Sequence, residues 1–198
     1  MRIDLEPIPT AVFFGVMVSW LIFAGIFLLR KKAPRAPERR RDRASFVGIV
    51  LQGLAYALVW SIRRPYFSPL FPIPRALEAV LALATLALAA GSVWVVLAAV
   101  RTLGKQWSFA ARLVEEHKLV TEGPYALVRN PIYMGMLGML VATGLVLSRP
   151  VGLVAALVLF GAGTFVRVRS EERLLREAFG AQFEAYARRV PAIFPRLY

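Results

Sequence analysis

The chain has 198 residues, of which 58% are hydrophobic, a formal net charge of +13 and a mean hydropathy of +0.60. A soluble domain of this size has no use for apolar runs long enough to cross a bilayer, so the runs described below exclude a water-soluble globular fold. The absence of cysteine and the single histidine exclude disulfides, thiolate chemistry and a metal site made of several imidazoles.

Three apolar runs lie in the first half of the chain, at residues 9–29, 46–62 and 79–100. Each approaches or exceeds the roughly 20 residues that an α-helix needs to cross a hydrocarbon core of about 30 Å. The first run is followed by basic residues and has no small-residue cleavage site, which favours a retained helix over a removed signal peptide. Residues 1–100 are therefore predicted to form three membrane-spanning helices.

Two shorter apolar runs, residues 132–147 and 151–166, are separated only by the sequence Ser-Arg-Pro. At about 1.5 Å per residue each run covers roughly 24 Å, which predicts a tight helical hairpin with short or tilted arms. With this hairpin, five membrane helices are expected. The predicted fold class is an all-α, polytopic membrane helical bundle in which residues 1–198 form a single membrane domain.

Basic residues gather in segments 30–43, 101–129 and 167–196, which hold 20 of the 25 Lys and Arg residues. All three segments fall on one side if five helices alternate in direction. By the positive-inside rule that side is cytosolic, so the C-terminus is expected in the cytosol and the N-terminus outside. The basic loops are interpreted as topology determinants that also contact anionic lipids, and nucleic-acid binding is not expected. Residues 30–45 are expected to be a mobile, charged linker.

The second half of the chain, residues 101–198, is predicted to form the functional core. Residues 101–131 are a connection that is long for a compact bundle, and such connections are usually functional or disordered. After the hairpin, apolar residues recur at helical spacing, which predicts an amphipathic cytosolic helix broken near Gly180 and ended before Pro191. Its apolar face is expected to lie on the membrane surface or to cover the long connection.

The sequence GPYALVRNPIYMG at residues 123–135 is expected to be irregular, because Pro124 and Pro131 each remove a backbone donor and disfavour helix before them. Irregular backbone at membrane depth survives only when it is buried in protein or lines a cavity. The stretch therefore predicts a cavity for a polar ligand near the cytosolic ends of the last helices. An alternative interpretation makes Tyr125 and Tyr133 interfacial anchors.

Ionisable residues near the last apolar run have both a structural and a functional interpretation. Glu171 and Glu172 are either a helix-end charge pair or carboxylates held for a cationic or hydroxyl-bearing ligand. Arg167 either pairs with Glu171, four residues later, or holds an anionic group of a substrate. His117 is either a surface residue or the one side chain that titrates near neutral pH.

Gly161 and Gly163 form a Gly-Ala-Gly sequence within the expected fifth helix. The sequence lacks the preceding strand and the helix start that a dinucleotide-binding fingerprint needs. Small residues that let two membrane helices pack closely are the better interpretation.

Two segments of the second half resemble a known superfamily. HKLVTEGPYALVRNPIYMG (residues 117–135) and, after one hairpin, EERLLREAFGAQFEAYARRVPAIFP (residues 171–195) are similar to the isoprenylcysteine carboxyl methyltransferase and phospholipid methyltransferase superfamily of integral-membrane enzymes. The resemblance covers roughly residues 101–195. It implies transfer of a methyl group from S-adenosylmethionine to a lipophilic acceptor, either an isoprenoid carboxylate or a lipid-like oxygen or nitrogen nucleophile, at the cytosolic membrane face.

The resemblance also implies roles for individual residues. It assigns cofactor binding to His117, Lys118, Leu119, Val120, Tyr125, Asn130, Pro131, Ile132, Tyr133 and Glu171. Acceptor binding is assigned to Arg167, and no metal is implied. The superfamily's common histidine is Asn130 here, as in its phosphatidylethanolamine methyltransferase branch, which weakens the case for a prenylcysteine acceptor and removes one candidate base. By itself, Asn130 is also typical of a turn or a helix cap before proline.

Two other functions stay open from the sequence. Sterol-type membrane reductases that use NADPH have a similar C-terminal arrangement, but they carry His-Pro-Asn-Tyr where this chain has Asn-Pro-Ile-Tyr. A non-catalytic membrane protein would use the basic linker to recruit acidic lipids or partners. Methyl transfer itself needs mostly proximity and exclusion of water. Where the acceptor must lose a proton, the candidate bases are His117, Glu171 and Glu172.

Overall fold

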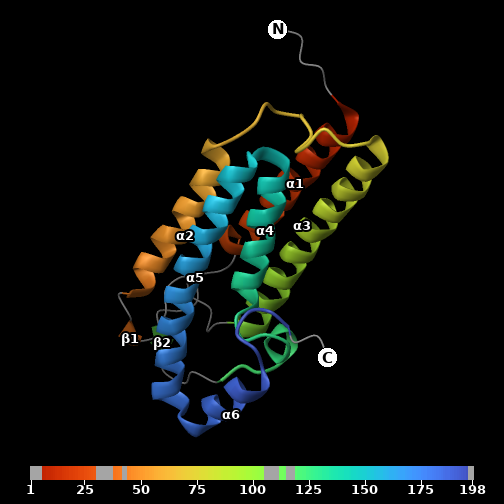
Figure 1. The fold of residues 1–198 in the computed structure, drawn as a ribbon. Helices are drawn as coiled ribbons and strands as arrows, with labels where there is room; N and C mark the ends of the chain where they lie inside the picture. The colour runs from red at the N-terminus through yellow and green to blue at the C-terminus, as the bar shows by residue number, and fades with distance from the viewer. Residues whose placement is uncertain (1–5, 30–37, 42–43, 105–111, 115–118, 196–198) are drawn as a thin grey trace.

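The computed structural model describes residues 6–29, 38–41, 44–104, 112–114 and 119–195. In this part of the chain five long helices run side by side, and a short sixth helix lies across one end of the bundle (Figure 1). The helices are α1 (Pro7–Leu28), α2 (Ala44–Ser61), α3 (Arg75–Leu103), α4 (Pro131–Leu147), α5 (Pro150–Phe179) and α6 (Ala181–Arg189), with one 3-10 turn, η2 (Gly123–Ala126), before α4. The predicted all-α membrane bundle is confirmed.

The five predicted apolar runs coincide with α1 to α5 in chain order, and the predicted hairpin turn joins α4 to α5. In the described part of the chain, α1, α2, α3 and α5 are long and apolar enough to cross a membrane, as judged by length and composition. The remaining apolar helix, α4, has 17 residues. At about 1.5 Å per residue it is roughly 25 Å long, which agrees with the short arm that the sequence predicts.

Helix α4 lies at the centre of the bundle, with α1 and α3 on one side and α2 and α5 on the other (Figure 1). Apolar side chains fill both contact regions and form two separate cores. Polar groups also join the helices inside the bundle. Trp20 of α1 donates to the Thr143 hydroxyl of α4 at 2.9 Å, and Tyr56 of α2 donates to the Met136 carbonyl of α4 at 2.7 Å. Such interhelical hydrogen bonds are typical of membrane bundles.

A glycine pair brings α2 and α5 into close contact. A Cβ atom on Gly163 would lie only 2.8 Å from the carbonyl oxygen of Gly48, so no larger residue fits without a shift of the helices. The predicted packing role is therefore confirmed for Gly163. Gly161 differs, because a Cβ atom there would meet nothing within 4 Å, and this residue lines a cavity.

Helix α5 continues well beyond the apolar run that was expected to end near Val166. It extends without a break to Phe179, so the predicted amphipathic helix is the last part of α5 followed by α6. Arginine and glutamate end an apolar run but are good helix formers, and therefore they do not end the helix. The predicted break is confirmed at Gly180, whose φ of +46° favours glycine. Helix α6 ends at Arg189, before Pro191, as predicted.

Two short strands add to the helical bundle. Strand β1 (Glu38–Arg41) pairs antiparallel with β2 (Arg112–Val114), at the same end of the molecule as α6 (Figure 1). Residues 38–41 therefore have regular structure, which differs from the expectation of a mobile linker over residues 30–45. Backbone hydrogen bonds between strands need no apolar pattern, so hydropathy does not reveal such a pair.

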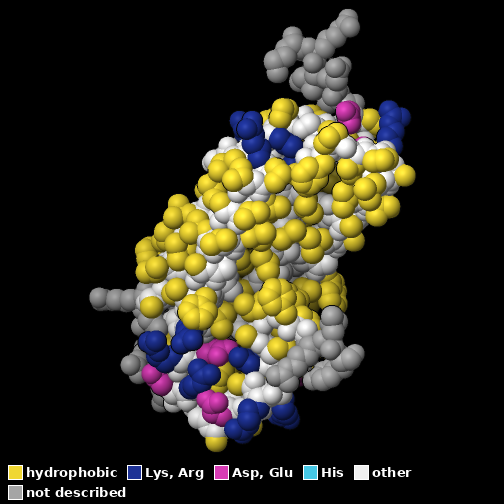
Figure 2. All heavy atoms as spheres, in the orientation of Figure 1, with side chains coloured by type: hydrophobic (Ala, Val, Ile, Leu, Met, Phe, Trp, Pro, Cys, Tyr) yellow, Lys and Arg dark blue, Asp and Glu magenta, His cyan; other side chains and the backbone are white. Residues whose placement is uncertain are grey.

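The surface of the bundle is divided by polarity. Figure 2 shows apolar side chains over the sides of the helices and charged side chains gathered at the two ends, most of them around α6. Large apolar residues such as Leu21, Trp94 and Val158 are more than half exposed. A soluble monomer rarely exposes apolar surface of this extent, so the protein is a membrane protein. Below, the end with α6 is called the basic end, and the end with the α4–α5 turn is called the hairpin end.

Candidate functional site

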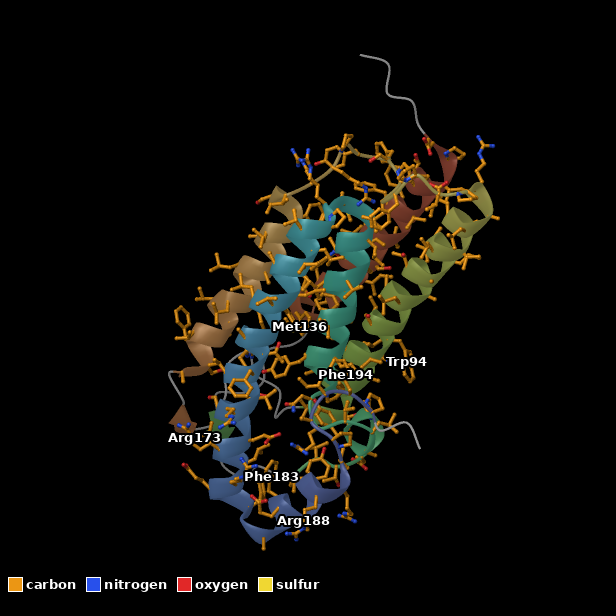
Figure 3. All side chains as sticks on the ribbon, in the orientation of Figure 1. Trp94, Met136, Arg173, Phe183, Arg188 and Phe194 are labelled. Atoms are coloured by element: carbon orange, nitrogen blue, oxygen red, sulfur yellow. The ribbon has the colours of Figure 1, made fainter. Side chains whose placement is uncertain are left out.

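At the basic end, α6 covers the connection that leads into α4. The hydroxyl of Tyr186 in α6 donates to the backbone carbonyl of Tyr125 at 2.7 Å. Phe183 lies on the side of α6 that faces the bundle, and Arg188 lies on the outer side (Figure 3). The apolar face of α6 is thus turned onto residues 119–130, which is the second of the two locations that the sequence predicted for it.

Arg129 joins the connection to both α5 and α6. Its Nε and Nη2 atoms donate to one carboxylate oxygen of Glu172 at 2.9 and 2.7 Å. Its Nη1 atom donates to the carbonyls of Ala187, at 2.9 Å, and Val190. The Arg129 and Glu172 side chains are only 14% and 11% exposed. A guanidinium at the last carbonyls of a helix caps that helix, so Arg129 holds the end of α6 next to α5.

The backbone after α6 pairs with the start of α4. The Arg129 amide donates to the Pro191 carbonyl at 2.8 Å, and the Asn130 amide donates to the Ala192 carbonyl at 2.9 Å. The Asn130 side chain donates to the same Ala192 carbonyl at 3.0 Å. Helix α4 then begins at Pro131, where a missing amide hydrogen costs nothing. Asn130 is therefore buried as a link between the C-terminal segment and the first turn of α4.

Side chains from three helices form a buried polar chain. The Tyr133 hydroxyl of α4 donates to a carboxylate oxygen of Glu171 in α5. The Arg167 guanidinium lies 3.7 Å from the same carboxylate oxygen and 4.8 Å from the centre of the Tyr133 ring. Arg167 also donates to Gln52 of α2 at 3.0 Å, and Gln52 in turn donates to the Thr164 hydroxyl at 2.9 Å.

Two tyrosines beside the polar chain resist ionisation. Burial raises the pKa of Tyr125 well above its usual value, and the negative charge of Glu171 raises this pKa further. Burial also raises the pKa of Tyr186 to about 12, against the opposing effect of the positive charge on Arg129. Both hydroxyls are therefore protonated at neutral pH and can donate hydrogen bonds.

A cavity of about 840 Å³ lies between α4 and α5. Its walls are mainly apolar and include Leu137, Leu157 and Phe160, and residues 192–194 close one side. Phe194 lies near the end of α4 that faces the connection (Figure 3). The polar lining residues are Tyr133, Thr164, Arg169, Glu172 and Arg176. The charged lining residues lie on the part of α5 nearest the basic end. The cavity for a polar ligand that the sequence predicts stays a prediction.

Tyr133 belongs to both parts of the site. Its hydroxyl is bonded to Glu171, and its side chain also lines the cavity. Glu171 and Arg167 are not among the described residues that line this cavity. The site therefore has two compartments, a polar chain and an apolar cavity, which meet at Tyr133 and also at Thr164.

The structure brings together most of the described residues that the sequence assigned to the site. Tyr133, Arg167 and Glu171 are in contact. Tyr125 is close enough to Glu171 for the carboxylate charge to raise its pKa. Asn130 and Pro131 form the adjacent start of α4. Leu119 and Val120 are half-buried in the connection. Ile132 is not part of this group, because it packs against the core between α1, α3 and α4. His117 and Lys118 lie outside the described residues.

Sequence reasoning missed the contribution of α2. Gln52 is only 2% exposed and is bonded to Arg167, yet it lies outside the segments that carry the family resemblance. One signal was available, because a polar residue inside an apolar membrane helix usually has a partner and often a function. The ion pair between Arg129 and Glu172 was also missed, since it joins residues far apart in the chain.

Apolar helices around a polar chain and a cavity define an integral-membrane protein with a polar site inside its helical bundle. Residues 80–182 match the phospholipid methyltransferase family. This region contains α4, all of α5, most of α3, and every contact between Tyr133, Arg167 and Glu171. The chain belongs to this family, and the resemblance seen in the sequence is confirmed.

Curated relatives match about half of the chain. Protein-S-isoprenylcysteine O-methyltransferase B of Arabidopsis thaliana is 36% identical over 99 residues, which are 49% of this chain and 50% of that protein. Cobalt-zinc-cadmium resistance protein CzcN of Cupriavidus metallidurans is 41% identical over 100 residues, which are 48% of this chain and 44% of that protein. Protein-S-isoprenylcysteine O-methyltransferase of Saccharomyces cerevisiae is 31% identical over 99 residues, 49% of this chain and 41% of that protein. The chain spans about half the length of the curated relatives it matches.

Proposed function

We propose that the protein is an integral-membrane methyltransferase that moves a methyl group from S-adenosylmethionine to a lipophilic acceptor. The observation that carries this proposal is the position of Tyr133, which joins a polar chain containing a carboxylate to an apolar cavity. A charged cofactor and an apolar acceptor need these two environments side by side for in-line transfer. Membership of the phospholipid methyltransferase family and the methyltransferase names of the plant and yeast relatives support the same reaction class.

The described residues fit S-adenosylmethionine in charge. Glu171 offers a carboxylate for a hydroxyl or ammonium group, with Tyr133 and Tyr125 beside it. The neighbouring apolar cavity of about 840 Å³, which is left for the acceptor, is within the range of roughly 300–1,000 Å³ that is common for ligand sites. When bound, the cofactor supplies a methyl group activated by a sulfonium, and the electron pair of the broken carbon–sulfur bond stays on sulfur. We assign its binding to residues 101–198, through the positions that the resemblance indicates.

The acceptor is proposed to occupy the apolar cavity. Phe165 of α5 lines this cavity and is also 59% exposed on the apolar side of the bundle, so an apolar chain can reach the cavity from the bilayer. Arg167, beside Tyr133, would hold a carboxylate of the acceptor with its guanidinium. A carboxylate acceptor has no proton to lose. A hydroxyl or amine acceptor loses one, for which Glu171 is the described carboxylate closest to Tyr133.

Binding and transfer can be tested on the purified protein in detergent. S-adenosylmethionine is expected to raise the unfolding temperature, and a labelled methyl group from it is expected to appear in an organic extract of membrane lipids. Glu171→Gln removes the negative charge and is expected to weaken cofactor binding by about 10- to 100-fold, the usual size of a lost charged hydrogen bond. Glu177→Gln is the matched control, because it removes an exposed carboxylate from the same helix.

Two outcomes would count against this function. Equal cofactor affinity in the Glu171→Gln and Glu177→Gln variants would exclude Glu171 from the site. Stabilisation by NADPH with none by S-adenosylmethionine would replace the methyltransferase by a membrane reductase of the sterol type.

We also place the basic end in the cytosol, in contact with anionic lipids, on the basis of the positive-inside rule. The natural chain contains no cysteine, so single cysteines report the topology cleanly. A membrane-impermeant thiol reagent applied to intact cells is expected to label Arg63→Cys at the hairpin end. The same reagent is expected to label Arg188→Cys, on the outer side of α6, only after the cells are permeabilised. The opposite pattern would reverse the orientation.

A further inference from the structure

Gln52 is a buried amide in the middle of α2, and both ends of the amide are used. Its oxygen accepts a hydrogen bond from Nη1 of Arg167 at 3.0 Å, and its nitrogen donates to the Thr164 hydroxyl at 2.9 Å. An amide inside a membrane helix is costly unless it is hydrogen-bonded, and such residues usually face the interior of the bundle. Gln52 therefore has a specific partner in α5, and that partner belongs to the polar chain.

Gly48, one turn earlier in α2, provides space for the same arginine. A Cβ atom on Gly48 would lie 2.3 Å from Cγ of Arg167 and 2.7 Å from the Gly163 carbonyl oxygen. The aliphatic part of Arg167 thus lies directly against the α2 backbone. Helix α2 provides both the space for the side chain and the acceptor for its guanidinium.

The hydrogen bond to Gln52 limits how closely the Arg167 guanidinium approaches the Glu171 carboxylate. The nearest guanidinium nitrogen is 3.7 Å from the carboxylate oxygen, which is longer than a charged hydrogen bond of about 2.7–2.9 Å. The hydrogen bond from Arg167 to Gln52 is 3.0 Å. Gln52 therefore holds the guanidinium on the α2 side, while the carboxylate of Glu171 accepts the Tyr133 hydroxyl. Loss of Gln52 removes this neutral acceptor, so the attraction of Arg167 to Glu171 is less opposed and the guanidinium competes more strongly for that carboxylate.

We propose that Gln52 is a positioning residue of the cofactor site, which acts by holding Arg167 away from Glu171. The inference rests on the proposed function, and it extends the site to α2 (Ala44–Ser61), which lies outside the residues 80–182 that match the family. The carboxylate that is kept available by this arrangement takes a cationic or hydroxyl-bearing group of the nucleotide cofactor.

The test compares variants of the full chain in detergent by calorimetric titration with S-adenosylhomocysteine and by methyl-transfer kinetics. Gln52→Leu is expected to weaken binding about tenfold, because Arg167 then competes with the cofactor for the Glu171 carboxylate, and one hydrogen bond to a charged group is worth about this much. The KM for S-adenosylmethionine is expected to rise in proportion, with a smaller change in kcat. Gln52→Glu keeps an oxygen acceptor for Arg167 and is expected to restore most of the affinity.

Val59→Ala is the matched control for a general loss of packing. Val59 is fully buried in α2 and packs in the core with Ala55 and Leu140, so its truncation destabilises the same helix. The control is expected to lower the unfolding temperature while the affinity for S-adenosylhomocysteine stays within about twofold of the natural protein.

The outcomes separate this inference from the proposed function. If the natural protein binds S-adenosylhomocysteine and Gln52→Leu binds it equally well, the positioning role is overturned and the proposed function stands. An affinity loss of the same size in Val59→Ala would also overturn the positioning role. If the natural protein itself binds neither S-adenosylmethionine nor S-adenosylhomocysteine, the proposed function fails, and this inference fails with it.

Discussion

Buried or half-buried arginines hold both ends of the bundle, but their partners differ. At the hairpin end, Arg64 donates to four backbone carbonyls, at Ser68, Leu145, Val146 and Ser148, over distances of 2.7–3.1 Å. At the basic end, Arg129 and Arg167 each lie against a carboxylate as well as neutral acceptors.

The difference between carbonyl and carboxylate partners reflects what each end of the bundle contains. The last carbonyls of a helix lack partners within the helix, so a guanidinium that binds them closes the helix end and has no need of a carboxylate. Glu171 and Glu172, in contrast, are charged side chains and not backbone groups that every helix end has. A carboxylate that is shielded from water needs positively charged partners. The hairpin end is closed by one arginine, whereas the basic end holds one buried and one half-buried carboxylate beside arginines, and the proposed function assigns one of them to a ligand.

The largest effect is expected from breaking the basic end at Arg129. Arg129→Ala leaves Glu172 without its closest partner and removes the donor to the last carbonyls of α6. Losing one member of a buried ion pair typically costs about 3–5 kcal/mol of unfolding free energy. Chemical unfolding in detergent measures this loss, and limited proteolysis is expected to cut near Gly180 in the variant.

The control for Arg129→Ala is Arg188→Ala, which removes an exposed arginine on the outer side of α6. It is expected to change stability by no more than about 0.5 kcal/mol. Equal stability of the two variants would mean that the contact between Arg129 and Glu172 does not hold the C-terminal segment.

A smaller loss is expected at the hairpin end. Arg64→Ala removes donors to the end of α4 and should cost about 1.5–3 kcal/mol, the value for hydrogen bonds that involve a charged group. Affinity for S-adenosylhomocysteine should not change, because α4 separates this end from Tyr133 by most of its length. Arg63→Ala removes an equal charge from an exposed neighbour and is the control. A loss of affinity in Arg64→Ala alone would show that the two ends are coupled.

Much of the fold could be predicted because membrane helices depend mainly on hydropathy along the chain. The run at residues 132–147 differs by one residue from α4, and the break at Gly180 follows from the conformational freedom of glycine. The length of α5 could not be predicted in this way, since its charged last part leaves the apolar region without leaving the helix. The β1–β2 pair depends on backbone contacts between distant segments, which hydropathy does not report.

Only those residues of the candidate site that lie in local sequence motifs could be predicted from the sequence. Tyr133 and Glu171 belong to segments that resemble the superfamily, and the structure joins them directly. Gln52 lies 115 residues from Arg167 in the chain, so no local spacing connects the two. The apolar cavity could not be predicted, because its walls come from residues of α4 and α5 that are ordinary for any membrane helix.

The smallest effect is expected from a neutral hydrogen bond at the basic end. Tyr186→Phe removes only the donor to the Tyr125 carbonyl, so at neutral pH the variant should be less stable by about 1 kcal/mol. This value should lie below the loss in Arg129→Ala, because no charge is left without a partner. A loss as large as that of Arg129→Ala would mean that charge pairing is not what distinguishes the basic end.

The pH dependence of this difference follows from the raised pKa of Tyr186. Tyrosine in the unfolded chain ionises near about pH 10, whereas burial raises the pKa of Tyr186 in the folded protein to about 12. The stability that comes from Tyr186 is therefore complete below pH 10 and is lost as pH rises towards 12, by up to about 1.4 kcal/mol per pH unit.

The Tyr186→Phe variant does not lose stability in this way, because phenylalanine does not ionise. The loss of stability that comes from Tyr125 is common to both proteins and cancels in the comparison. The gap between the two unfolding free energies should therefore narrow above about pH 10 and close near about pH 11. A gap that stays constant over this range would show that the Tyr186 hydroxyl is not protected from ionisation in the folded protein.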